Sequence, residues 1–226
     1  MQKVIVINAK GGCGKSTIAT NIASFYAARG LNTALFDHDP QGSSMQWLRR
    51  RPQTCQSIYG VAAYEQGSAT TRAWQLRVPA EIARVVTDTP AGLKGYELGD
   101  FLKDVDKIIV PVLPSAIDIN ATANFMRELF FVAKVKPSHT PVYVVANRIK
   151  ARTKSFQGLE RFLEGLNVPV AAYLRDTVNY VQAAEQGVGV HELPLNKVER
   201  DIEAWRQLMN TLDPEIASRS CSISYA

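Results

Sequence analysis

A single glycine- and lysine-rich segment near the start of the chain constrains the fold more than any other feature. It is KGGCGKST, residues 10–17, and it lies between an apolar run, Lys3–Asn8, and a helical pattern, Ser16–Arg29. Gly30 follows the helical pattern directly, where a left-handed residue commonly ends a helix. A strand that passes through a glycine-rich turn into a helix is typical of α/β proteins. The segment therefore predicts a chain in which strands alternate with helices.

The rest of the sequence continues this alternation. Apolar, β-branched runs that predict strands lie at Thr33–Asp37, Arg84–Thr87, Lys107–Val112, Val142–Ala146 and Val168–Tyr173. Helical patterns lie at Ser115–Lys134, Lys154–Leu166, Asn179–Gln186 and Asn196–Leu212. Near-continuous apolar strands that alternate with helices predict an α/β fold with a doubly wound, mostly parallel sheet flanked by helices. Ligands of such sheets bind at the carboxyl ends of the strands.

The chain is long enough for one such domain and short for two, so we expect a single domain over residues 1–226. Two parts are harder to interpret. Residues 41–75 combine a tryptophan, three consecutive arginines, a proline and a glycine without a clear period. The tail, residues 213–226, contains Pro214 and several serines, and we treat it as a candidate flexible end.

Composition narrows the class of protein. Hydrophobic residues make up 46% of the chain and charged residues 21%, as in ordinary soluble globular proteins. The net charge of +5 suits contact with a polyanion, and equally a basic surface without a partner. Three cysteines without CxxC spacing argue against a disulfide framework and a zinc site. The apolar stretch Val4–Ile7 is too short for a signal peptide, so we expect a cytoplasmic protein.

The chemistry of residues 10–17 is that of a phosphate-binding loop, although Ala9 stands where the general GxxxxGK[ST] signature has its first glycine. Glycines let backbone N–H groups wrap around phosphate oxygens, and the helix that follows adds its positive dipole end. Lys15 should reach the β- and γ-phosphates, and the Ser16 hydroxyl should bind Mg²⁺. The residues expected to hold the nucleotide here are Gly11, Gly12, Cys13, Gly14, Lys15, Ser16 and Thr17.

The sequence AKGGCGKST closely resembles the deviant phosphate loop, KGGxGK[ST], of the ParA/MinD partition and positioning ATPases. The resemblance implies a deviant P-loop NTPase that binds ATP and Mg²⁺. It also implies that Lys10 is the family's signature lysine, which reaches across an ATP-sandwiched homodimer to the phosphates of the partner subunit. A second cation at that place would neutralise charge on the transferring phosphoryl group, as an arginine finger does.

Two further segments end in carboxylates. DHDPQG, residues 37–42, resembles the family's DxDPQG switch, and we call it the switch segment. By that match Asp39 orients the attacking water and Asp37 is a candidate near Mg²⁺, although Asp-Pro and Gln-Gly are also plain turn signals. VVTDTPAG, residues 85–92, resembles the second nucleotide motif, in which Asp88 holds Mg²⁺ and Gly92 offers its N–H to the γ-phosphate.

The run YVVANR ends in two further candidate nucleotide-binding residues, Asn147 and Arg148. Asn147 resembles the family's base-reading asparagine, whose amide pairs with the adenine edge; asparagine is also common at strand ends. LRD at residues 174–176 resembles the family's IPR region more loosely, since Leu174 replaces the usual proline. The resemblance spans about Lys3 to Gly189, with its specific motifs concentrated before residue 93.

Basic residues gather in one short stretch, Arg148, Lys150, Arg152 and Lys154, which we call the basic loop. Members of the resembled family bind DNA without sequence preference as ATP-bound dimers, and salt-dependent phosphate contacts would supply that binding. Arg49–Arg51 is a second cluster. A solvated surface is the alternative for both, because most charge runs simply face water.

Together these features lead us to expect a dimerising, DNA-stimulated ATPase, cytoplasmic and nucleoid-associated. With a ParB-like or adaptor protein it would position a cargo, either a plasmid, a chromosome or a protein body such as a carboxysome. A MinD-like membrane-cycling ATPase is the alternative, but the tail shows little of the basic amphipathic helix that it needs, so we expect no membrane partner.

Two other users of such a loop fit the sequence less well. A nitrogenase-type iron protein needs cysteines that bind its cluster, and the sequence has none between Cys55 and Cys221. A dethiobiotin-synthetase-like ligase would lack Lys10 and Asp39 as a set.

Overall fold

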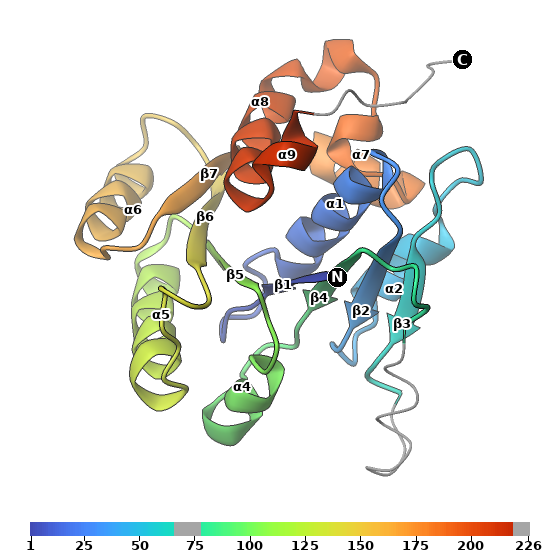
Figure 1. Ribbon diagram of the computed structural model, residues 1–226. Coiled ribbons are helices and arrows are strands. Elements are labelled where there is room, and N and C mark those ends of the chain that lie inside the picture. Colours follow the sequence, from blue (N-terminus) through green and yellow to red (C-terminus); the bar gives the residue numbers. More distant parts are fainter. Residues whose placement is uncertain (66–77, 219–226) are drawn as a thin grey trace.

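The computed structural model describes residues 1–65 and 78–218, and in them one parallel sheet lies between two layers of helices (Figure 1). The strands are β1 Gln2–Val6, β2 Thr33–Asp37, β3 Tyr59–Ala62, β4 Arg84–Asp88, β5 Lys107–Val112, β6 Val142–Ile149 and β7 Val170–Arg175. Their order across the sheet is β3-β2-β4-β1-β5-β6-β7, and every pairing is parallel. The prediction of a doubly wound, mostly parallel sheet is confirmed.

Successive side chains of the central strand point to opposite faces of the sheet and so join two separate cores. Val4 and Val6 pack with the layer that contains α1 and α8, and Ile5 packs with the layer that contains α4, α5 and α6. The helices are α1 Lys15–Ala27, α2 Ser43–Arg49, α4 Gly95–Phe101, α5 Ala116–Arg127, α6 Lys154–Gly165, α7 Asn179–Gln186, α8 Leu195–Leu212 and α9 Pro214–Ala217. Two shorter turns are η1 Glu128–Val132 and η2 Val190–Glu192.

The winding of the chain reverses at β1. The segments from β2 to β4 lie on one side of this strand and those from β5 to β7 on the other, so β1 is flanked by β4 and β5. Doubly wound sheets bind ligands in the crevice outside the carboxyl ends of the strands at such a reversal. The loop that follows β1 therefore opens into the place where this fold holds its ligands.

Several elements differ from the sequence-based expectation. The helix expected to reach Lys134 ends as an α-helix at Arg127 and continues as the π-helical turn η1, which keeps Leu129 buried and Phe131 exposed. Strand β6 continues beyond Ala146, to Ile149. Residues 41–65 contain α2 and β3, of 7 and 4 residues, which are too short to give a recognisable period. Residues 66–75 of the same stretch lie outside the described residues.

The first part of the expected flexible tail is packed against the body of the domain. Asp213 forms an ion pair with Arg84 at 2.7 Å, and Ile216 in α9 is only 3% exposed. Residues 219–226 lie outside the described residues. Among the helices that the structure describes, none combines the length and the apolar character needed to cross a membrane.

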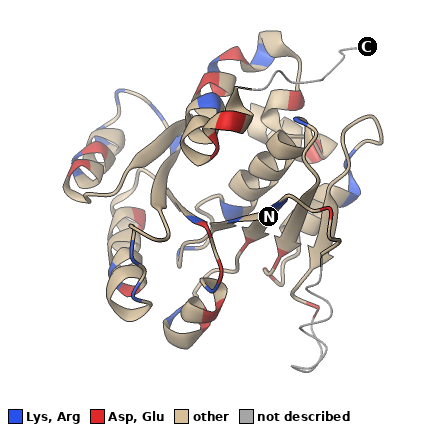
Figure 2. Ribbon diagram, in the orientation of Figure 1, with Lys and Arg blue, Asp and Glu red and all other residues tan. Residues whose placement is uncertain are grey.

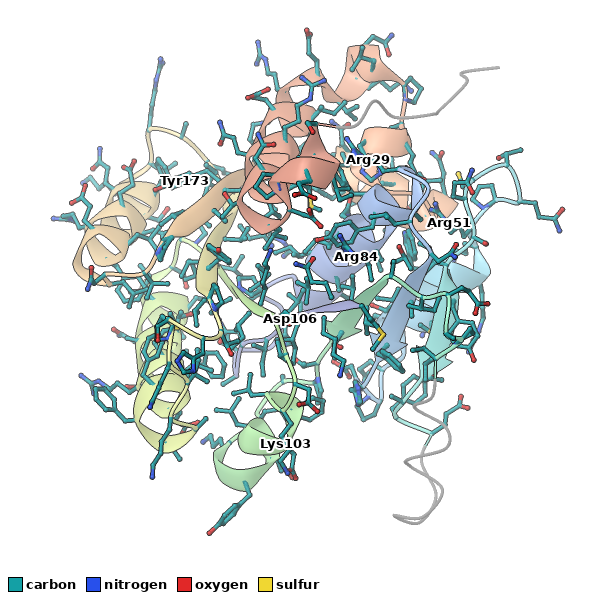
Figure 3. The ribbon with its side chains drawn as sticks, in the orientation of Figure 1. Arg29, Arg51, Arg84, Lys103, Asp106 and Tyr173 are labelled. Atoms are coloured by element: carbon teal, nitrogen blue, oxygen red, sulfur yellow. The ribbon has the colours of Figure 1, made fainter. Side chains whose placement is uncertain are left out.

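A buried ion pair ties the chain just after α2, where Figure 3 labels Arg51, to the segment after α7. The Arg51 guanidinium contacts the Glu192 carboxylate at 2.7 Å, and both side chains are 5% exposed. The same guanidinium donates to the Gly187 carbonyl at 3.3 Å, and the Trp47 indole N–H donates to the Val188 carbonyl at 3.2 Å. These contacts fix α2, and with it the segment after β2, to a distant part of the sequence.

This clamp gives a first test. Arg51→Ala should destabilise the protein by about 3–5 kcal/mol, because it leaves the Glu192 carboxylate buried without its partner. The double variant Arg51→Met with Glu192→Met should recover most of that loss, since neither side then buries an unpaired charge. Urea unfolding of the three proteins measures both effects. Equal losses in the single and double variants would contradict an electrostatic role for the pair.

Candidate nucleotide-binding site

The phosphate loop, residues 10–17, joins the end of β1 to α1, as expected. Gly12 and Gly14 have φ values of 76° and 96°, which side chains other than glycine rarely adopt. A Cβ atom on Gly14 would lie 2.2 Å from Nδ2 of Asn147. Since α1 begins at Lys15, its first N–H groups face the loop that these glycines shape. The loop thus has the backbone form that an anion-binding turn requires.

The Lys15 side chain is held inside the loop. Its ammonium donates to the Lys10 carbonyl at 3.1 Å, and only 6% of the residue is exposed. The Cys13 thiol contacts the same carbonyl at 3.2 Å, and burial raises the pKa of this thiol. Cys13 can therefore meet a phosphate through its backbone, because its side chain is turned into the protein. A neutral carbonyl is a weaker partner for an ammonium than an ionised phosphate oxygen is.

The Lys10 backbone lies at the entrance of the loop, and its N–H donates to Oδ1 of Asn8 at 3.1 Å. Lys10 is half-buried, and no described residue forms an ion pair with its ammonium. Its side chain is therefore available for a ligand or for a second subunit.

The two strand-terminal carboxylates lie side by side because their strands are in register. Asp37 of β2 is paired with Asp88 of β4, and Asp88 is paired with Val6, which ends β1. Both aspartates are fully buried. The ends of β1, β2 and β4 therefore bring the phosphate loop, the switch segment and the second nucleotide motif to one level of the sheet.

Asp37 is occupied by the backbone of the switch segment. Oδ2 accepts the N–H of Met45 at 2.9 Å, and Oδ1 accepts the N–H of Asp39 at 3.1 Å. Burial raises the pKa of this carboxyl. Asp37 thus anchors the start of α2, and its place near Mg²⁺, which the resemblance implies, stays a prediction, because each carboxylate oxygen can accept a second contact.

Asp88 has the free oxygen that Asp37 lacks. Its Oδ2 accepts the Ser44 hydroxyl at 2.7 Å, whereas Oδ1 has no hydrogen-bond partner within the described residues. Burial raises the pKa of Asp88 to about 6, although the hydroxyls of Ser44 and Ser16 favour its ionised form. A buried orphan carboxylate oxygen next to the Ser16 hydroxyl fits Mg²⁺, which takes one or two protein oxygens and completes its shell with phosphates and water.

Ser44 is a site residue that the sequence analysis missed. It lies in the first turn of α2, and its hydroxyl links the switch segment to Asp88. Two consecutive serines directly after the switch segment look like a polar turn. The signal that could have identified Ser44 was its place directly after the switch segment. In a helix that starts there, one of the two serines must face the strand ends.

Asp39 and Gly92 both follow strand ends at the same edge of the sheet but differ in availability. Asp39 is half-buried, and its Oδ1 accepts the Gln41 N–H at 3.0 Å. The Gly92 N–H donates to the Ala9 carbonyl at 2.8 Å, so a γ-phosphate oxygen would take the place of that carbonyl. An open hollow of about 790 Å³ adjoins both segments and gives water access to this edge.

Asn147 braces the phosphate loop through its side chain. Its Nδ2 donates to the Cys13 carbonyl at 2.8 Å, and its Oδ1 accepts the Arg148 N–H at 2.9 Å. The residue is 4% exposed. The sequence analysis did not foresee this bracing contact. Because both polar atoms of the side chain are engaged, pairing with a base would have to share or replace these bonds, and the base-reading role stays a prediction.

A second hollow, which we call the α7 hollow, opens beyond the start of α1 and has a volume of about 460 Å³. Thr17, Asn147 and three residues of α7, Tyr180, Val181 and Ala184, line it. Its other lining residues are polar or charged: Arg50, Arg148, Arg175, Asp176, Thr177 and Glu185. A hollow beside the loop that combines apolar side chains with several polar groups suits a nucleoside whose phosphates occupy the loop.

The basic loop leaves the sheet at the end of β6, and all four of its cations are exposed. Arg148 and Arg152 have left-handed φ values of 51° and 66°, and Lys150 pairs with Asp176 at 3.1 Å. Asp176, from another part of the sequence, thus offsets part of the positive charge of the loop. Figure 2 shows acidic and basic residues interspersed on helices such as α6 and α8. The cluster Arg49–Arg51 is reduced to two cations, because Arg51 is buried against Glu192.

Comparison with known proteins agrees with this geometry. The family model described as the CobQ/CobB/MinD/ParA nucleotide binding domain matches residues 4–190. A maintenance of carboxysome distribution protein A from Halothiobacillus neapolitanus is 30% identical over 83% of this chain and 86% of its own length. Its namesake from Gloeobacter kilaueensis is 29% identical over 93% of each chain. In the solved MinC:MinD complex of Aquifex aeolicus, a chain of the same fold matches with a TM-score of 0.71 at 17% identity, over 95% of this chain and 96% of that one.

The buried carboxyl of Asp88 gives a prediction about pH. Because its pKa is raised to about 6, the native state holds this proton more tightly than the unfolded chain does. The ionised group therefore destabilises the native state above pH 6, and this effect disappears below the ordinary value of 3.8. Asp88→Asn should be more stable than the wild type by about 2–3 kcal/mol near pH 7.5 without Mg²⁺, and by almost nothing near pH 4.

Urea unfolding at the two pH values measures this difference. Asp104→Asn is a suitable control, because Asp104 is exposed and its φ of 56° is one that asparagine tolerates. The control should change the stability little at either pH. An Asp88→Asn protein that is less stable than the wild type near pH 7.5 would show that the carboxylate is not strained by burial.

Proposed function

The chain belongs to the CobQ/CobB/MinD/ParA family of nucleotide-binding ATPases, and from that premise we propose that it is a cargo-positioning ATPase. In this proposal it binds ATP with Mg²⁺, closes into a homodimer around the nucleotide, and holds to DNA as a dimer. Hydrolysis of ATP to ADP and phosphate then ends the dimer and releases the DNA.

The observation that carries the proposal is the meeting of three strand ends. Asp37 and Asp88 end in register with β1, so the switch segment and the candidate metal carboxylate lie directly beside the phosphate loop. A single buried carboxylate at this place would not by itself indicate phosphoryl transfer. A carboxylate with a free oxygen, an ammonium held in a glycine loop and a second aspartate in an adjacent turn together supply the parts that phosphoryl transfer needs.

The chain's own residues act on the nucleotide in a simple division of labour. Lys15 exchanges the Lys10 carbonyl for β- and γ-phosphate oxygens, and the N–H groups of the loop bind the phosphates from the other side. Ser16 and Asp88 would hold Mg²⁺, whose charge stabilises the phosphates during transfer. Asp39 accepts a hydrogen bond from the attacking water and keeps it in line with the γ-phosphorus.

Dimerisation is proposed on the state of Lys10. Its ammonium lacks an ion-pair partner among the described residues, and it stands at the entrance of the loop. A cation from the partner subunit would neutralise charge that builds up on the γ-phosphate. Each subunit would thereby complete the site of the other, so the ATP-bound state and the dimer would coincide.

The cargo is proposed to be a protein body of the carboxysome kind. Two relatives that this chain matches over more than four fifths of its length both have names that refer to carboxysome distribution. Non-specific DNA contact through the basic loop, Arg148–Lys154, would place the dimer on the nucleoid, and a ParB-like or adaptor protein would connect it to the cargo. Plasmid or chromosome partition is the same mechanism with another cargo.

The catalytic assignment is tested by two substitutions. Lys15→Ala should abolish ATP binding, because it removes the cation that the phosphates need. Asp39→Ala should bind ATP as well as the wild type but should hydrolyse it at least about a hundredfold more slowly, and so accumulate as the dimer. Calorimetry and phosphate release measure these effects. Normal ATP affinity after Lys15→Ala would sink the assignment, and unchanged turnover after Asp39→Ala would assign the water to another residue.

The DNA contact is tested by charge reversal in the basic loop. Replacing Arg148, Lys150, Arg152 and Lys154 with glutamate should weaken binding of the ATP-bound protein to a duplex of arbitrary sequence. The dependence of log K on log salt should become shallower by about 0.9 for each DNA phosphate that the protein no longer neutralises. Lys150 should contribute least, because Asp176 already holds it.

A control of equal charge separates a local contact from the net charge of the protein. It reverses four exposed cations on other elements: Lys94, Arg127, Lys134 and Lys136. If the control weakens DNA binding as much as reversal of the basic loop does, the basic loop is only part of a diffuse surface.

A further inference from the structure

The end of α2 reaches the α7 hollow. Arg50, the residue that follows α2, lines this hollow together with Thr17, Asn147, Tyr180 and Val181. Arg50 comes from a different part of the chain than the other lining residues, since it follows the switch segment. Neither the family resemblance nor the sequence pattern assigned it a role in nucleotide binding.

The three consecutive arginines at this point differ in what they contact. Arg51 is fully engaged by Glu192 and by the Gly187 carbonyl. The Arg50 guanidinium, by contrast, has no hydrogen-bond or ion-pair partner among the residues that the structure describes, and the residue is exposed. Arg49 is also exposed but does not line the hollow. Arg50 is thus the one member of this triplet that both borders the hollow and has an uncommitted cation.

The backbone of Arg50 is fixed although its side chain is not. Its N–H donates to the Trp47 carbonyl at 3.1 Å, and the clamp at Arg51 follows directly. Gly187 approaches so closely that a Cβ atom there would lie 2.4 Å from the carbonyl carbon of Arg50. A fixed backbone with a free planar cation is suited to meet a ligand, because only the side chain, and not the backbone, loses conformational freedom on binding.

The chemistry of the hollow indicates which part of a nucleotide Arg50 meets. The phosphates would bind to the loop and to the first N–H groups of α1, near Thr17. The rest of the lining includes the side chains of Tyr180, Val181 and Ala184, which suit an aromatic ring, beside the charged groups of Arg148, Arg175, Asp176 and Glu185. A guanidinium that borders these side chains can stack on the flat face of a base placed in the hollow.

We propose that Arg50 stacks on the nucleobase of the bound nucleotide and is a specificity-determining contact for nucleoside over bare phosphate. The proposal rests on the proposed function, because it takes the phosphate loop to be a nucleotide site. It adds that both ends of α2 belong to the nucleotide site. Ser44 at its start donates to the candidate metal carboxylate Asp88, and Arg50 at its end lines the hollow in which it would contact the base.

The test compares two ligands that differ only in the nucleoside. Calorimetry with Mg²⁺ measures the affinity of the wild type, Arg50→Ala and Arg49→Ala for ATP and for inorganic tripolyphosphate. Arg50→Ala should bind ATP about tenfold more weakly, the size of a partly desolvated stacked cation. It should bind tripolyphosphate within about twofold of the wild type, because that ligand has no base for Arg50 to contact. Arg49→Ala, which removes the same charge one residue away, should leave both affinities unchanged.

Each other outcome has a distinct meaning. If Arg50→Ala weakens both ligands equally, Arg50 acts on the phosphates through its charge, and the stacking proposal is overturned. If it changes neither, Arg50 does not contact the nucleotide. If the wild type binds neither ligand, the proposed function fails together with this inference, whereas loss of ATP affinity confined to Arg50→Ala leaves the phosphate loop as described. Thermal melting of the three proteins confirms that the variants are folded.

Discussion

The register of the three central parallel strands is the constraint on which the rest of the site depends. Val6, Asp88 and Asp37 are aligned partners across β1, β4 and β2, so three separate loops must leave the sheet at one level. Side chains on both faces of these strands are packed into two cores, and a slip by one residue would turn every buried side chain to the wrong face. The positions of these candidate site residues are therefore fixed by the hydrophobic core rather than by contacts among the residues themselves.

Burial also disfavours the ionised form of the carboxyl groups at these strand ends. Asp37 and Asp88 are fully enclosed, and burial raises the pKa of each carboxyl. Two hydrogen bonds stabilise the ionised Asp37: it accepts one backbone N–H from the switch segment and one from α2. These bonds hold the start of α2 against the site. One oxygen of Asp88 has no hydrogen-bond partner among the described residues, so a cation bound there would supply the interaction that this buried oxygen lacks.

The sequence predicted the fold and the individual motifs well because both depend on local patterns. Apolar runs mark the strands, and the spacing of glycines and lysines in residues 10–17 marks the phosphate loop. What could not be predicted depends on contacts across the fold. Asp37, and not Asp88, accepts the backbone N–H of Met45, and this difference cannot be read from either motif. The hydrogen bond by which Asn147 braces the loop joins residues 134 positions apart. Arg49–Arg51 reads as one basic cluster in sequence, whereas the structure gives each arginine a different environment.

We propose that Lys10 and the phosphate loop close a dimer around ATP, and analytical ultracentrifugation measures the size of the resulting particle. The protein saturated with Mg²⁺ and an ATP analogue that is not hydrolysed should sediment as a species of twice 24.9 kDa, and with ADP it should sediment as a monomer. Lys10→Ala should bind the analogue and stay monomeric, because the cation that each subunit lends to the other is missing. A wild-type protein that remains a monomer with the bound analogue, or a Lys10→Ala variant that dimerises as readily, would show that Lys10 does not close a dimer around ATP.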